Sequence, residues 1–151
     1  MCLMLGTLLL VLGCTTRRPV PHESIQGVYE HASRHEALVA LKNILIQDSI
    51  PIRSFDLKSG TIVSDSFEAA PRYCDCGRNF FGAEYPGTRR GVMRIKASGG
   101  QDFRVKFEFS TLLTITANNK QVHCTSFGIL EGEILAALDS TLGMKRVNAV
   151  N

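Results

Sequence analysis

Four residues in the second half of the chain carry side chains that could bind a metal ion: Cys74, Cys76, His123 and Cys124. Together they supply the donor atoms of a Cys₃His zinc set. The C-x-C spacing is tighter than zinc ligands usually show, and His123 and Cys124 would point to opposite faces of a strand. We therefore expect no metal site and no cofactor.

A reactive thiol is the second chemistry that these residues suggest. Arg72 and Arg78 flank the Cys74–Cys76 segment, and nearby cations favour a thiolate. A redox pair, however, normally has C-x-x-C spacing beside a βαβ pattern, and neither is present. The sequence also shows no Ser-His-Asp order, P-loop or dinucleotide fingerprint. We predict that the protein is not an enzyme.

The first thirteen residues indicate export. They are uncharged and mostly apolar, and the run is too short to span a bilayer. Val11-Leu12-Gly13-Cys14 resembles the lipobox of bacterial lipoproteins, which implies cleavage after Gly13, acylation of Cys14 and, with Thr15 next, an outer-membrane location. The alternative is an ordinary secretory signal in which Cys14 has no such role.

The remaining chain is long enough for one domain. We predict a signal peptide over 1–13, a lipidated N-terminus and tether over 14–30, a single domain over 31–145 and a flexible tail over 146–151. The formal net charge of +3 is too small to indicate a nucleic-acid partner.

Hydrophobic periodicity predicts an α+β domain. Ser33 and Glu36 form a capping box, followed by a helix that ends before Pro51. A hairpin over 52–67 and a long loop over 73–87 come next, with a short strand around 79–81. Alternating residues over 93–97 and 103–109 predict a second hairpin. The same alternation continues through Leu113, Ile115 and Ala117, and a further extended piece follows over 121–124. A helix over 130–142 closes at Gly143.

These elements predict a two-layer sandwich, an antiparallel sheet with two helices packed on one face, close to the helix-grip arrangement. The lipobox, the first helix and hairpin, Tyr73–Gly77 and the segment from Cys124 to Glu131 resemble small proteobacterial outer-membrane lipoproteins. Their domain is similar to those of the lipoprotein C subunit of the β-barrel assembly machinery. The resemblance implies a non-catalytic binding or assembly component on the outer membrane, facing the periplasm.

Export also makes a disulfide plausible. Cys74, Cys76 and Cys124 remain after the lipid site and the signal, so one thiol is left over. Cys74 and Cys76 are too far apart in an extended chain to bond each other easily, which makes Cys124 the partner of one of them. Gly77 and the lipoprotein resemblance favour the pair Cys76–Cys124, with Cys74–Cys124 as the alternative.

One local surplus of positive charge could bind a partner. Arg89, Arg90, Arg94 and Lys96 could contact anionic lipid headgroups or an acidic envelope protein. The alternative is that they form only the wet face of a strand. A second function class also stays open, a periplasmic thiol-dependent or metal-binding protein that uses Cys74, Cys76 and Cys124.

Overall fold

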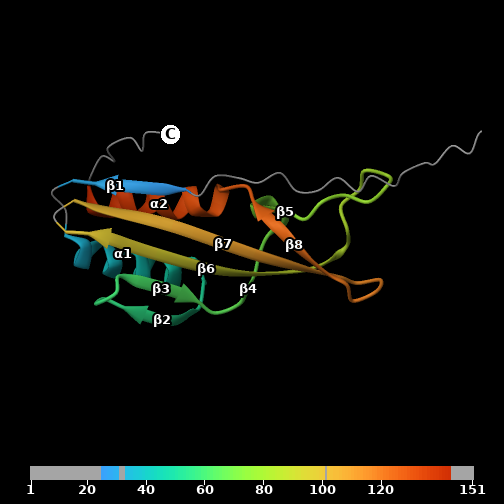
Figure 1. Cartoon of the computed structure of the whole chain (residues 1–151), viewed down its shortest axis with the longest axis horizontal. Coiled ribbons are helices and arrows are strands. Elements are labelled where there is room, and N and C mark those ends of the chain that lie inside the picture. The colour runs from blue at the N-terminus through green and yellow to red at the C-terminus, as the bar shows by residue number, and fades with distance from the viewer. Residues whose placement is uncertain (1–24, 31–32, 101, 144–151) are drawn as a thin grey trace, which may run out of the picture.

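A long antiparallel hairpin forms the centre of the domain. The computed structural model describes residues 25–30, 33–100 and 102–143, and within them β6 (Gly87–Gly99) pairs with β7 (Phe103–Ile115) over their whole length (Figure 1). Met93 and Ile95 are fully buried, whereas Arg94 and Lys96 are exposed, as their alternation predicts. Strand β6 begins earlier in the chain than the alternating residues alone indicated.

Shorter strands extend the hairpin into an eight-stranded sheet. One edge carries β2, β3 and β4, and the other carries β1, β8 and β5. Their bounds are β1 Gln26–Tyr29, β2 Ile52–Asp56, β3 Thr61–Ser64, β4 Phe67–Glu68, β5 Cys74–Asp75 and β8 Gln121–Ser126. The predicted first hairpin is present as β2 and β3, and Gly60 in its turn has a φ of 72°.

Two helices of fourteen residues each begin and end where the sequence predicts. Helix α1 (Arg34–Gln47) is capped by the Ser33 side chain, which accepts a hydrogen bond from the Glu36 amide at 3.3 Å. Helix α2 (Ile129–Leu142) ends at Gly143 in the left-handed conformation. A short 3₁₀ turn, η1 (Pro71–Tyr73), precedes β5.

Both helices lie on the same side of the sheet, behind the strands in Figure 1. Their apolar faces and the inward residues of β6 and β7 form the main core, in which the largest buried side chains include Leu38, Ile95, Phe107 and Ile134. The domain is therefore an α+β two-layer sandwich, which confirms the predicted fold class. A second, smaller cluster at the far end of the hairpin contains Cys74, Cys76, Leu113 and Ile115.

Two local predictions were wrong. Gln26–Tyr29, which we assigned to the tether, form β1 on β7, because Tyr29 is fully buried and stacks on Phe103. Its hydroxyl donates a hydrogen bond to Asp139 at 2.6 Å. Residues 79–81 form no strand. That segment is instead a turn closed by an isolated bridge between Arg78 and Glu84, and the strand of this region is β5.

The remaining domain boundaries fall largely outside the described residues. The predicted signal peptide over 1–13, Cys14, most of the tether and the tail over 146–151 lie there.

Candidate functional site

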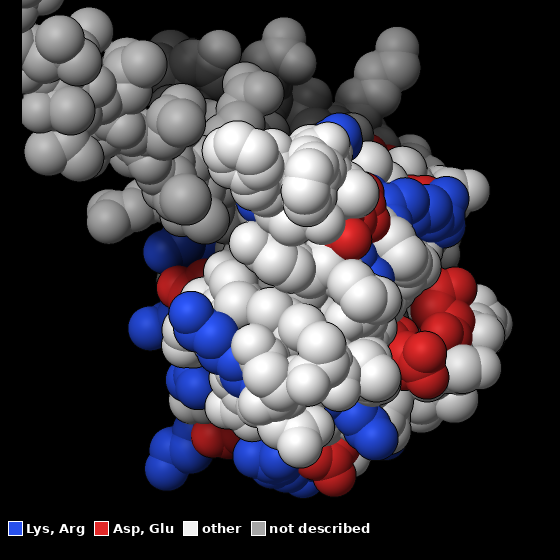
Figure 2. All heavy atoms as spheres, turned by 90° about the vertical axis from the view of Figure 1, so that its right-hand side faces the viewer, with Lys and Arg blue, Asp and Glu red and all other residues white. Residues whose placement is uncertain are grey.

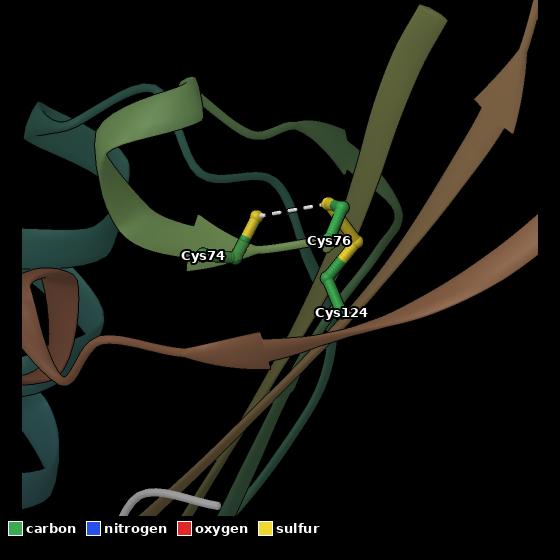
Figure 3. Close-up of side chains that lie close together, drawn as sticks. All are labelled: Cys74, Cys76 and Cys124. Atoms are coloured by element: carbon green, nitrogen blue, oxygen red, sulfur yellow. Dashed lines mark hydrogen bonds between the residues drawn. A yellow bond between two sulfur atoms is a disulfide. The ribbon is translucent and has the colours of Figure 1, made fainter. Parts of the chain in front are cut away.

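Three cysteine sulfurs meet at the small cluster because of the pairing between β5 and β8. Cys74 lies opposite Ser126 and Asp75 opposite Thr125, which brings Cys76, the residue after β5, to Cys124. Cys74 and Cys76 are two residues apart and therefore share a face. The antiparallel register thus places all three side chains together, as Figure 3 shows.

Two of the sulfurs are bonded and the third is in contact with them. Cys76 and Cys124 form a disulfide with an S–S distance of 2.06 Å, which is the pairing that the sequence analysis favoured. The Cys74 thiol is free and lies 3.9 Å from the Cys76 sulfur. All three Sγ atoms lie within 4.8 Å of one another. His123 is not part of this cluster, since it is exposed on the other face of β8, opposite Leu112.

A cavity of about 240 Å³ opens beside the cluster. Its lining includes Cys74, Cys76, Arg89, Glu84 and Phe127. The Arg89 side chain is only 10% exposed and forms an ion pair with Glu84 at 3.0 Å. Its Nε atom is buried and has no hydrogen-bond partner. The cavity therefore joins a free thiol, a disulfide and a buried guanidinium group with one unused donor.

Burial controls the state of the free thiol. Removal from water raises the pKa of Cys74, and the positive charge of Arg89 acts in the opposite direction. Cys74 is thus held in the neutral thiol form at neutral pH, which disfavours attack on the neighbouring disulfide.

The basic residues singled out from the sequence divide between the two faces of the sheet. Arg90, Arg94 and Lys96 are exposed on the face that carries no helix. The Arg89 side chain points to the face that carries the helices, and it lies across from Leu113 of β7. This follows because β6 begins at Gly87, so the alternation of its side chains between the two faces already includes position 89. The four residues therefore do not form one surface, and grouping them was wrong.

The opposite strand adds two cations that we had not included. In the register, Ser98 faces Arg104 and Lys96 faces Lys106, and both β7 side chains are exposed. The Ser98–Gln101 turn signal together with the alternation could have located them. We define the basic sheet face by its exposed cations, which are Arg90, Arg94, Lys96, Arg104 and Lys106.

Few carboxylates balance this basic sheet face. Glu108 pairs with Lys106 at 3.1 Å, and that is the only ion pair among its members in the described part of the chain. Glu68 lies opposite Arg90 on β4, and Asp56 lies at the β2 edge. Strands β6 and β7 thus contribute five cations and one carboxylate to this face of the sheet.

Another exposed feature lies at the end of the hairpin that carries the sulfur cluster. Phe80 and Phe81 are 69% and 89% exposed in the turn that follows β5, and Phe127 at the cavity is 47% exposed. This end of the molecule faces the viewer in Figure 2, where an uncharged surface is bordered by charged side chains. The sequence analysis did not single out these aromatic residues.

Among the described residues, no helix is long and apolar enough to cross a membrane. No protein-family model matches the chain, and the comparison with curated proteins finds no significant match.

Proposed function

We propose that the protein is a non-catalytic cell-envelope lipoprotein, acylated at Cys14 and held on the outer membrane, whose domain binds an acidic protein partner in the periplasm. The basic sheet face is the observation that supports binding most directly. The anchor is supported by the apolar run that ends in Val11-Leu12-Gly13-Cys14.

The composition of this face suits a protein surface. Arg94 and Lys96 lie beside the half-buried apolar residues Val63 and Val92, so the face offers charge together with apolar area. Arginine is enriched at protein interfaces, and complementary charge increases the rate of association with an acidic partner. No helix of the described chain covers this face of the sheet.

Site-directed photocrosslinking in native membranes tests the binding face. A photoreactive residue at Ser98, on this face, should give a discrete adduct, whereas one at Ser59, in the turn between β2 and β3, should not. The combined change Arg94→Glu and Lys96→Glu should abolish the adduct. Lys58→Glu, which reverses an exposed cation away from the face, should leave it unchanged.

Two results would contradict the proposed partner. An adduct that survives the double charge reversal would show that the basic sheet face does not bind it. Binding of the purified domain to vesicles of anionic phospholipid with the same charge dependence, without any protein adduct, would assign the face to lipid headgroups instead.

The anchor is tested separately, by the mass of the mature N-terminal peptide. We expect a peptide that begins at Cys14 and carries acyl chains, and no such mass for a Cys14→Ser variant. A mature protein that begins at another residue, or at an unmodified Cys14, would refute the lipoprotein assignment while leaving the binding face to its own test.

A further inference from the structure

The three-sulfur cluster contains more chemistry than a structural crosslink needs. A disulfide requires two cysteines, and Cys76 with Cys124 supplies them. Cys74 is buried at 4% exposure and its sulfur lies 3.9 Å from that of Cys76. A buried cysteine can act as a small apolar residue, but this thiol lies against a disulfide, on the wall of an open cavity.

We propose that the reduced form of this cluster is a metal site, in which Cys74, Cys76 and Cys124 bind a single Cu(I) ion as three thiolates. The Cys76–Cys124 disulfide keeps the site closed. A dithiol reductant opens it by exchange: two electrons pass to the disulfide, its S–S bond breaks, two cysteine thiols form, and the reductant leaves as its own disulfide.

The spacing of the sulfurs fits a shared metal ion. Sulfur ligands at about 2.3 Å from one ion lie about 4.0 Å apart in a trigonal site and about 3.8 Å apart in a tetrahedral one. Cys74 and Cys76 are already 3.9 Å apart. Reduction must separate Cys76, which directly follows the two-residue strand β5, from Cys124, which lies within β8.

The donor set selects the metal. Thiolates are soft ligands, which favour Cu(I) and zinc over hard cations. Structural zinc takes four protein ligands, and no His, Asp or Glu of the described chain joins the three sulfurs within the same distance. Three thiolates without a fourth side chain therefore suit Cu(I) better.

The surroundings offset the charge of such a complex. Three thiolates and one Cu(I) carry two negative charges, and binding releases the three thiol protons. Arg78 and Arg89 line the cavity, and the buried Arg89 Nε–H has no partner. The two carboxylates of the lining are already bonded, Asp75 to the Gly77 amide at 2.8 Å and Glu84 to Arg89.

A Cu(I) titration under anaerobic conditions tests the site. The full chain carrying Cys2→Ser and Cys14→Ser leaves these three cysteines as its only thiols. After reduction and removal of the reductant, it should take a single Cu(I) ion per chain from a chromogenic Cu(I) chelator. The same chain with its disulfide intact should take none, which makes the oxidised protein the matched control.

Cys74→Ser separates a three-thiolate site from a pair of reduced cysteines. Loss of an outer-shell partner already costs about 10-fold to 100-fold in metal affinity, so loss of this ligand should weaken Cu(I) binding at least about tenfold. The variant keeps the Cys76–Cys124 disulfide, and its oxidised form should retain the native circular dichroism spectrum.

Three outcomes would overturn the proposal. The first is equal Cu(I) uptake by the oxidised and reduced chains. The second is undiminished affinity after Cys74→Ser. The third is a reduced chain that takes up no Cu(I), whether it stays folded or unfolds, since the site requires the reduced fold. None of these results depends on the lipid anchor or on the basic sheet face.

Discussion

The stability of the domain should depend strongly on the disulfide. Cys76 and Cys124 are 48 residues apart, and for a loop of this size the chain-entropy model gives a stabilisation of about 4 kcal/mol. The best perturbation is the double variant Cys76→Ala with Cys124→Ala, because it leaves Cys74 without a neighbouring thiol to pair with. For a domain of this size, a loss of about 4 kcal/mol corresponds to a fall in melting temperature of about 15 °C.

Thermal unfolding followed by circular dichroism, with and without dithiothreitol, measures this effect. Without the reductant, the double variant should melt about 15 °C below the parent protein. With the reductant the two should melt close together. The control is Cys74→Ser, because Cys74 and Cys76 are almost equally buried, at 4% and 5% exposure. Its melting temperature should shift by a smaller amount, and the reductant should still destabilise it.

The reasoning fails if the parent protein melts at the same temperature in both conditions although peptide mapping shows the disulfide intact before reduction. It also fails if Cys74→Ser abolishes the effect of the reductant, because the stabilising bond would then include Cys74.

Three further predictions concern the sheet and its turns. Gly60→Ala should destabilise the domain more than Gly82→Ala in chemical denaturation: both have positive φ, but the new Cβ meets the Ala97 carbonyl oxygen at 2.2 Å only at position 60. Met93→Asp should prevent folding, judged by circular dichroism, while Arg94→Asp should leave the domain folded although it places a second carboxylate opposite Glu108. The Arg53 hydrogen bond and the Ser66 amide lower the pKa of Asp65 below 3.8. The ionised Asp65 carboxylate therefore contributes its full stabilisation above pH 3.8 and loses it as the pH falls through the lower pKa of the folded state. The destabilisation caused by Asp65→Asn in urea denaturation should shrink as the pH is lowered.

Strong periodicity explains what the sequence predicted well. The alternation through Met93 and Phe107 set the inward face of the hairpin, and the capping box at Ser33 located the start of α1. These signals are local and repeat several times. The inward face of the sheet and the two helices then leave a two-layer sandwich as the natural arrangement.

The parts that were missed depend on contacts between distant residues. Strand β5 has two residues, too few for any period to appear, and it exists because it pairs with β8. The meeting of three sulfurs follows from that register. Likewise β1 is held by the burial of Tyr29 against Phe103 and Asp139, which are distant in sequence. Arg104 and Lys106 were within reach, since the hairpin turn already placed them opposite Ser98 and Lys96.

The two unequal clusters along the central hairpin have a consequence for the motions of the native protein. The helices protect one end of β7, around Phe103–Phe109, whereas the other end rests on four buried residues and a crosslink. We therefore expect two foldons. After reduction, amide hydrogens of Thr111–Thr114 and β8 should exchange with deuterium through a local opening. Those of Phe103–Phe109, in the part of β7 that the helices cover, should exchange only through global unfolding. Exchange at equal rates along β7 would show that the sheet opens as one unit.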